Sequence, residues 1–167
     1  MELLAGGKYL TSVGHVDLSC EYKLDDGELC MRGGPIMLGY YKDPEGTAEV
    51  IDAEGWFHTG DIARVEEDGY MYLTGRKKNV IILDSGENVS PEELEKLLVP
   101  CADIRECIVK EKDKKICALI YCDPAKQETV KEFVTGVNRG LPLYKRMVPE
   151  FSAQPLPRNA MGKLLRQ

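Results

Sequence analysis

Three short stretches carry side chains or turns that could do chemistry. Asp61 follows a glycine in "HTGDIA", a place from which a carboxylate can reach the hydroxyls of a ribose. A turn aspartate that caps local amides would show the same spacing. Arg76 in "TGRKKN" could contact a ribose or a phosphate, although basic clusters at turns are commonly solvated surface. Gly86 in "DSGENVSPEELE" allows a close backbone approach to a ligand, or only turns the chain.

A fourth stretch, "PLPRNAMGKLLRQ", ends the sequence and contains the pair Gly162 and Lys163. A phosphate-binding loop requires an earlier glycine, a Ser or Thr after the Gly-Lys pair, and a helix behind it. Pro157 stands where that earlier glycine would be, and Leu164 follows the lysine. The pair is therefore not a phosphate loop, and the ammonium of Lys163 needs another role.

Charge is distributed unevenly along the 167 residues. The net charge of −6, with 43% hydrophobic and 30% charged residues, is typical of a soluble globular protein and argues against affinity for nucleic acid or an anionic membrane. The segment after Leu141 differs, because its cations outnumber its single acid, Glu150. Its cations are Lys145, Arg146, Arg158, Lys163 and Arg166. This segment suits either an anionic small molecule or an ordinary solvated face.

Targeting and metal signals are weak throughout the sequence. The longest apolar run, residues 80–83, has the length of a strand and not of a membrane span. The apolar run in the opening "MELLAGGKYLTS" is too short for a secretory signal, and the stretch begins with an acidic residue where such a signal has basic ones. Six cysteines without a C-x-x-C pair, beside two histidines, indicate buried thiols in place of a zinc site or a disulfide framework. We expect a cytoplasmic location and no metal site.

The first part of the chain, residues 1–76, has the pattern of β-structure. Short runs rich in β-branched and aromatic residues lie between Asp-Gly turns at 26–27 and 68–69. These runs predict strands over residues 27–33, 55–65 and 69–75, and helical spacing occurs only at 44–51. The sequence therefore predicts a small β-barrel or hairpin sheet.

The second part, residues 77–167, alternates strand and helix patterns. Ser90, Pro91 and Glu93 predict an N-cap, a first helical residue and a capping box. The patterns predict helices over residues 90–98 and 125–139, and strands over 80–83, 104–111, 115–123 and 147–157. We expect an α+β domain in which helices cover a three-stranded sheet with an added hairpin, joined to the first part by a hinge at 76–79.

Taken in order, these motifs resemble a known family. The series "GPIMLGYYKDPEGTAEVI…EGWFHTGDIARVEEDGYMYLTGRKKNVIILDSGENVSPEELE…PLPRNAMGKLLR" resembles the C-terminal part of AMP-forming acyl-CoA synthetases of the fatty-acid and coumarate ligase type. The resemblance runs from about Ser12 to the last residue. It implies an enzyme that converts a carboxylic acid, here a fatty acid, and ATP into an acyl adenylate, and then transfers the acyl group to CoA.

The resemblance also implies a role for five positions of this chain. Asp61 corresponds to the carboxylate that binds the ribose hydroxyls, and Arg76 assists at the same sugar. Lys78 falls at the hinge about which the C-terminal domain swings between the two half-reactions. Gly86 falls on the loop that lines the pantetheine channel. Lys163 corresponds to the lysine that bridges the carboxylate substrate and the phosphate.

The sequence also departs from the family pattern. Asn159 stands where many members have a Thr, a change that a turn-forming side chain tolerates. The Ser/Thr/Gly-rich phosphate loop, the adenine segment and the segment that helps to hold ATP and Mg²⁺ do not occur. We therefore expect a truncated chain or the product of a shortened gene, whose partner is the missing N-terminal domain. Alone it should be inactive, with ATP or AMP, CoA and Mg²⁺ bound only in the full-length enzyme.

Two other functions agree with the same motifs. A non-catalytic module could keep the fold and bind CoA or a partner protein. An acyl activator could instead load a carrier protein. Such activators usually carry an Asp at the hinge and a basic residue soon after the loop glycine, whereas Lys78 and the pair Glu87-Asn88 occupy these places here.

Overall fold

The structure, a computed structural model, describes residues 12–15 and 19–166. Residues 1–11, which include most of the opening stretch that the sequence analysis compared with a secretory signal, lie outside the described part. The chain forms two compact units, the first ending at Lys78 and the second beginning at Asn79. The sequence predicts that a domain of the family ends at residue 76 and the next begins at residue 77. This boundary stays a prediction, because the two compact units are defined by contacts within the chain and not by comparison with the family.

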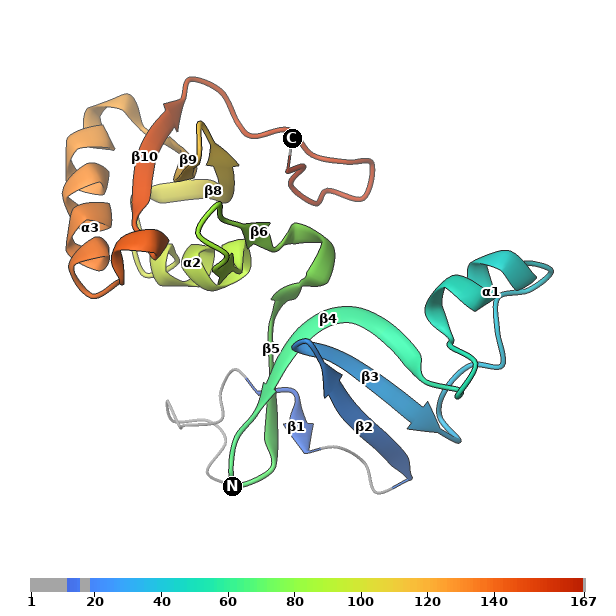
Figure 1. The fold of residues 1–167 in the computed structure, drawn as a ribbon. Helices are drawn as coiled ribbons and strands as arrows, with labels where there is room; N and C mark the ends of the chain where they lie inside the picture. The colour runs from blue at the N-terminus through green and yellow to red at the C-terminus, as the bar shows by residue number, and fades with distance from the viewer. Residues whose placement is uncertain (1–11, 16–18, 167) are drawn as a thin grey trace, which may run out of the picture. The chain divides into compact units, whose positions relative to one another are not determined.

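The first unit contains one antiparallel sheet with the strand order β1-β5-β4-β3-β2 (Figure 1). Its strands are β1 (Gly14–His15), β2 (Cys20–Asp25), β3 (Glu28–Gly33), β4 (Phe57–Val65) and β5 (Tyr70–Arg76). Of the two predicted forms, the hairpin sheet is present and the barrel is wrong, because within the described residues the edge strands β1 and β2 do not pair with each other. Closure requires every strand to have two neighbours, and β1 is only two residues long.

Local sequence explains the elements of this unit. Asp26 and Gly27 adopt positive φ angles of 48° and 80°, which matches the two-residue turn that joins twisted strands. The charged edge strand β2 was not predicted, since "CEYKLD" carries few strand-forming residues. Helix α1 (Pro44–Val50) begins where the Asp43 side chain accepts a hydrogen bond from the Gly46 amide at 2.8 Å. A small core of Leu29, Ala63 and Met71 lies under the sheet.

The second unit is the α+β domain that the sequence predicts. Its three-stranded sheet has the order β10-β9-β8, in which β8 and β9 form an antiparallel hairpin and β10 runs parallel to β9. A separate two-stranded hairpin joins β6 to β7. The short helix η1 (Lys77–Asn79) spans the boundary between the two units. The elements that follow it are β6 (Ile81–Ile82), β7 (Asn88–Val89), α2 (Pro91–Leu98), β8 (Ile104–Lys112), β9 (Lys115–Cys122), η2 (Pro124–Lys126), α3 (Gln127–Arg139), η3 (Leu143–Lys145) and β10 (Met147–Ser152).

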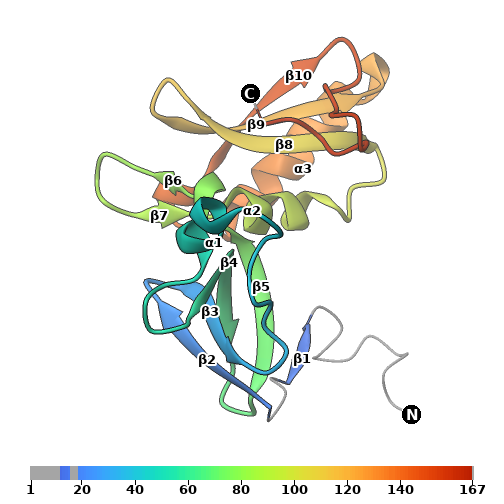
Figure 2. The same cartoon turned by 90° about the vertical axis from the view of Figure 1, so that its right-hand side faces the viewer.

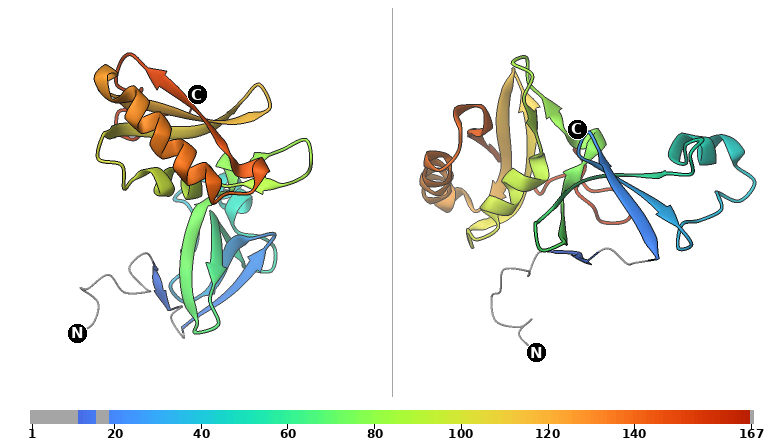
Figure 3. Two further views of the ribbon diagram at one scale, coloured as in Figure 1. Left: turned by 90° about the vertical axis from the view of Figure 1, so that its left-hand side faces the viewer. Right: turned by 60° about the horizontal axis from the view of Figure 1, so that its bottom comes forward.

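Helices α2 and α3 cover the three-stranded sheet, as Figure 3 shows. Leu94 and Leu98 of α2 and Val130 and Val134 of α3 are buried in one core with the strands. These positions recur at helical spacing, which agrees with the helices that the sequence predicts over residues 90–98 and 125–139.

The start of α2 differs from the prediction in one contact. Ser90 is the N-cap and Pro91 the first helical residue, but Ser90 makes no side-chain cap hydrogen bond to the helix. Its hydroxyl donates to Glu92 at 3.2 Å, and Glu93 pairs with Lys145 at 3.2 Å. The hydrogen bond that the Ser90 side chain would give to a capping box is therefore not formed, and one oxygen of Glu93 contacts Lys145 instead.

The strand predicted over residues 147–157 ends at Ser152. The chain then returns beside β8 (Figure 2), where the Leu156 amide donates to the Glu106 side chain at 2.7 Å. Among the described residues, no helix is both long enough and apolar enough to span a bilayer.

Candidate functional site

Strands β4 and β5 bring Asp61 and Arg76 face to face as cross-strand partners. Arg76 Nε lies 2.9 Å from Asp61 Oδ1, and the Asp61 side chain is 22% exposed. Arg76 also donates to the Thr59 carbonyl at 3.4 Å. The Asp61 amide donates to Thr59 Oγ1 at 3.1 Å. The structure therefore joins two of the five sequence-predicted site residues in one half-buried ion pair.

A buried carboxylate contacts the chain neighbours of this pair. Glu28 is 3% exposed and accepts hydrogen bonds from Lys77 Nζ at 2.8 Å, His58 Nδ1 at 3.1 Å and the Gly60 amide at 2.9 Å. Burial alone would raise the pKa of Glu28, but the hydrogen bonds from Lys77, His58 and Gly60 outweigh it and hold the pKa below its ordinary value. Sequence reasoning missed Glu28, because its partners are distant in the chain.

One group among residues 12–15 and 19–166 has metal-ligand side chains close together: Asp25, Cys30 and His58. However, His58 Nδ1 faces Glu28 at 3.1 Å and His58 Nε2 faces Asp52 at 3.4 Å. The hydrogen bond to Glu28 raises the pKa of His58 against the effect of burial, and Asp52 adds to the rise. Each ring nitrogen faces a carboxylate, so this arrangement favours the protonated ring over a metal ligand.

The next two predicted positions lie on either side of the first strand of the second unit. Lys78 is exposed within η1. Gly86 turns the β6–β7 hairpin with a φ of 93°, and its amide donates to the Leu83 carbonyl at 2.8 Å. A Cβ added at Gly86 would meet no described atom within 4 Å. The backbone conformation, and not crowding, therefore explains this glycine.

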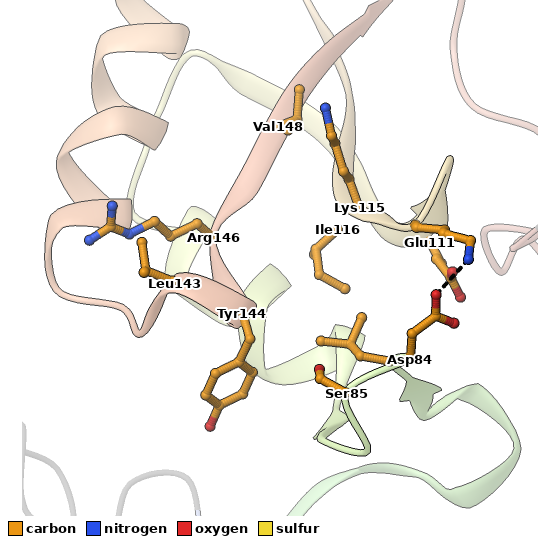
Figure 4. Close-up of a pocket in the computed structure, with 11 residues that line it drawn as sticks. Asp84, Ser85, Glu111, Lys115, Ile116, Leu143, Tyr144, Arg146 and Val148 are labelled. Carbon is orange, nitrogen blue, oxygen red and sulfur yellow. Dashed lines mark hydrogen bonds and ion pairs between the residues drawn. The ribbon is translucent and has the colours of Figure 1, made fainter.

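A cavity of about 420 Å³ opens beside the Gly86 loop. Figure 4 shows Ser85 and Asp84 at its lower rim, Tyr144 of η3 across from them, and Ile116 of β9 between. The Arg146 side chain extends past Leu143, away from Ile116, and its guanidinium donates to the Leu141 carbonyl at 3.3 Å.

The cavity mixes an apolar floor with cations at its edge. Lys114, Lys115 and Arg146 all line it. Lys114 is already paired with Asp84 at 2.6 Å, whereas Arg146 is held only by a backbone carbonyl among the contacts of the described residues. An aromatic ring beside cations suits a ligand that carries both a flat ring and phosphate groups.

Lys163 lies in a tight loop near the end of the chain. The Asn159 side chain accepts hydrogen bonds from the amides of Met161 and Lys163, both at 3.0 Å, and the Gly162 amide donates to the Asn159 carbonyl at 2.9 Å. Gly162 has a φ of 79°, so glycine serves the turn conformation here. The Lys163 side chain is exposed, and no described residue pairs with its ammonium.

Two arginines fasten this loop at its ends, and sequence reasoning did not identify their partners. Arg158 pairs with Glu106 of β8 at 2.7 Å and also donates to the Gly162 carbonyl at 2.6 Å. Arg166 makes two contacts with Glu95 of α2, at 2.5 and 2.7 Å. The basic character of this segment was visible in the sequence, but its ion pairs depend on the fold.

Comparisons with known proteins identify relatives of the chain as a whole. No family model matches the chain. It is 40% identical over 147 residues to 2-methylpropanoate–CoA ligase of Humulus lupulus, an alignment that covers 83% of the chain and 26% of the relative. It is 36% identical over 149 residues to 4-coumarate–CoA ligase 2 of Oryza sativa subsp. japonica, covering 84% of the chain and 26% of the relative. The chain thus spans about a quarter of the length of these relatives.

Solved structures of CoA ligases also match the chain. The o-succinylbenzoate CoA synthetase of Bacillus subtilis, solved in complex with its acyl-adenylate intermediate, matches with a TM-score of 0.76 and 28% identity, over 94% of this chain and 35% of that one. The anthranilate CoA ligase AuaEII, in complex with anthranoyl-AMP, matches with a TM-score of 0.74 over 92% of this chain and 32% of that one. The chain therefore belongs to the adenylate-forming, AMP-forming acyl-CoA synthetase family and corresponds to the C-terminal portion of its members.

Proposed function

We propose that this chain is the catalytic C-terminal part of an AMP-forming acyl-CoA synthetase, which makes an acyl adenylate from ATP and a carboxylic acid and then a CoA thioester. The observation that carries the proposal is Lys163, an exposed ammonium without a described partner at the tip of a loop fixed by Asn159. A loop that is ordered by its backbone while its cation stays unpaired fits a group that acts on a ligand bound elsewhere.

The chemistry of the first half-reaction requires such a cation. Attack of a carboxylate on the α-phosphate brings two anions together and increases charge on the phosphoryl oxygens. An ammonium can hold both anions, and loss of one electrostatic donor typically costs on the order of 10² to 10³ in rate. Lys163 would supply this charge, and it would leave the pocket when CoA enters for the second half-reaction.

The pair of Asp61 and Arg76 would hold the ribose. One carboxylate oxygen of Asp61 bonds Arg76 at 2.9 Å, so acceptor capacity remains for the two hydroxyls of a sugar. The Arg76 side chain is half exposed. With a ribose bound to Asp61, Arg76 would lie beside the sugar hydroxyls. Lys78 would be the hinge residue, and the N-terminal part of a synthetase would supply the rest of the ATP and Mg²⁺ site.

The cavity beside the Gly86 loop supports CoA as the acceptor. CoA carries an adenine ring and phosphates, which fit Tyr144 and the nearby cations Lys115 and Arg146. The thiol arm would then pass along the backbone of the Gly86 loop. Arg146 would turn from the Leu141 carbonyl to reach the phosphates.

The acid substrate is the least constrained part of the proposal. A fatty acid is the prediction from the motif series, whereas the names of the relatives include 2-methylpropanoate and 4-coumarate. A panel of straight-chain, branched and aromatic acids in the experiment below would separate these classes. All six cysteines are free thiols, which fits the cytoplasm as the proposed location.

The test is a fusion of the whole chain behind the N-terminal portion of the rice 4-coumarate–CoA ligase that the chain does not cover. Pyrophosphate exchange would measure adenylation, and release of the CoA thioester would measure the second step. We expect both activities, and we expect Lys163→Ala to lower exchange by about 10² to 10³-fold while thioester formation from supplied acyl adenylate persists.

The matched control is Lys131→Ala, which removes an exposed lysine of α3 that pairs with Glu128 at 3.7 Å. It should leave both rates within about twofold. A fusion that is folded and inactive would contradict the proposal and favour a non-catalytic module. A fusion that loads a phosphopantetheinyl protein and not free CoA would identify a carrier-protein activator.

A further inference from the structure

Glu28 is the one charged side chain that is buried among the described residues. It begins β3, next to the Asp26-Gly27 turn and opposite Asp25 of β2. A buried carboxylate is costly unless donors compensate it. Replacement of a whole buried ion pair by apolar side chains is often neutral for stability, so stability alone is a weak explanation for a buried carboxylate and its partner here.

The donors that compensate Glu28 come from two particular places. Glu28 Oε1 accepts from the Gly60 amide at 2.9 Å, and Gly60 immediately precedes Asp61. Glu28 Oε2 accepts from Lys77 Nζ at 2.8 Å, and Lys77 immediately follows Arg76. One carboxylate therefore holds the chain neighbour of each member of the Asp61–Arg76 pair.

This geometry constrains both strands where they carry the pair. Gly60 has a φ of 70°, and its amide points at Glu28 instead of at a neighbouring strand. The register between β4 and β5 shifts after Ile62, just beyond Asp61. Regular ladder pairing is interrupted there, and the hydrogen bond from Gly60 to Glu28 is a side-chain contact that holds the backbone on the other side of Asp61.

Lys77 also connects Glu28 to the segment that leaves the sheet. Lys77 is the first residue of η1, and Lys78 is the second. The Lys77 side chain is about half exposed while Glu28 is buried, so the ion pair joins the surface of the connecting segment to the interior of the first unit.

We propose that Glu28 is a positioning residue, which sets the geometry of the Asp61–Arg76 pair through Gly60 and Lys77 and fixes the start of the segment that contains Lys78. The inference rests on the proposed function for its catalytic consequence, and on the contacts of the chain itself for its geometric part. Glu28 does not touch the nucleotide on this proposal.

Glu28→Gln tests the inference with little change in shape. A glutamine has only one oxygen, so it cannot accept from Gly60 on one side and from Lys77 and His58 on the other. The matched control is Glu21→Gln, which removes a carboxylate of β2 that is paired with Arg32 at 2.6 Å on the exposed surface. Circular dichroism would establish that each variant is folded at the temperature of the assays.

The first arm uses the isolated 167-residue chain. Amide hydrogen exchange and NMR shifts should show at least about tenfold faster exchange of the Gly60 amide in Glu28→Gln, with shifts at Asp61 and at the Arg76 Nε–H. Lys77→Met keeps the carboxylate, so it should shift Arg76 without faster exchange at Gly60. If Glu28→Gln does not fold, Lys77→Met alone still tests whether the Glu28–Lys77 ion pair sets the position of Arg76. Unchanged Arg76 signals in both variants would overturn the inference.

The second arm uses the fusion described above. Glu28→Gln should raise the KM for ATP by about tenfold, the loss expected for one charge-assisted hydrogen bond, while kcat for exchange changes little. Lys163→Ala should instead lower kcat. A lower melting temperature with an unchanged KM for ATP would show a purely structural role and overturn the inference. If the wild-type fusion is inactive, the proposed function fails while the first arm still decides the positioning.

Discussion

At the scale of the residue, His58 makes stability depend on pH. Its ring contacts Glu28 and Asp52 through its two nitrogens, with Cys30 Sγ at 3.4 Å and Lys77 on the same carboxylate. The pKa of His58 is raised above 6.5, mainly by Glu28. Its stabilisation is therefore complete below pH 6.5 and is lost as pH rises through the folded-state pKa.

We expect the stability difference between wild type and His58→Gln to shrink as pH rises from about 6 to 9. Urea unfolding followed by Trp56 fluorescence would measure it, because Trp56 is the single tryptophan and its amide donates to Asp52 at 2.9 Å. Burial raises the pKa of the Cys30 thiol, so that thiol stays neutral over most of this range. Parallel stability curves for the two proteins would contradict the assignment.

Glu28 contributes at the acid end of the same range. Its pKa lies below 4.5, because its three donors outweigh burial. The stabilisation it gives is therefore present above pH 4.5 and is lost as pH falls through the folded-state pKa. Glu28 and His58 together favour maximal stability of the first unit between these two limits.

A second residue-scale prediction concerns Arg146 at the cavity beside the Gly86 loop. Arg146→Ala should raise the KM for CoA by about tenfold in the fusion, because it removes a charge-assisted contact to phosphate. Pyrophosphate exchange should be unchanged, since adenylation does not involve CoA. Arg139→Ala, at the exposed end of α3, is the control. An equal effect on exchange would assign Arg146 to the folding of η3 instead.

At the scale of the element, the loop that carries Lys163 depends on ion pairs with β8 and α2. Arg166 is 24% exposed and contacts Glu95, which also accepts from the Val109 amide at 2.7 Å. Burial lowers the pKa of Arg166, but the ion pairs with Glu95 and Glu92 outweigh burial and raise it. We therefore expect the Arg166–Glu95 ion pair to contribute to the stability of the second unit.

Arg166→Met should lower the free energy of unfolding of the second unit by about 1–3 kcal/mol, because Glu95 loses its cation. Thermal unfolding by circular dichroism would measure the change. Lys131→Met, which breaks an exposed pair within α3, should change stability by less than about 0.5 kcal/mol. Equal effects of the two variants would show that the Arg166 contacts do not hold the tail.

At the scale of the whole molecule, the 167 residues carry Lys163, Asp61 and Arg76 but no Ser/Thr/Gly-rich phosphate loop. We therefore expect the purified chain to give no pyrophosphate exchange above background, even at high ATP. Exchange that Lys163→Ala abolishes would contradict this prediction, since it would place a complete adenylation site within the chain. The same measurement on the fusion provides the positive control.

Much of the architecture could be predicted from local signals. The Asp-Gly turns fixed the hairpin at 26–27, and the apolar spacing of Val130 and Val134 predicted α3. Two elements could not be predicted so well. The edge strand β2 is rich in charge, and the extent of β10 depends on a parallel pairing with β9 across α3. Long-range pairing of this kind leaves no local pattern.

By itself, the sequence determined the family, most of the helices and strands, and Lys163 and Asp61 as candidate groups, because these follow from motif order and local periodicity. Only the tertiary structure decided that the first sheet stays open, that Asp61 meets Arg76, and that the buried Glu28 contacts their chain neighbours. Sheet closure, ion pairing and burial depend on residues far apart in the chain, and these meet only when the strands adopt their register.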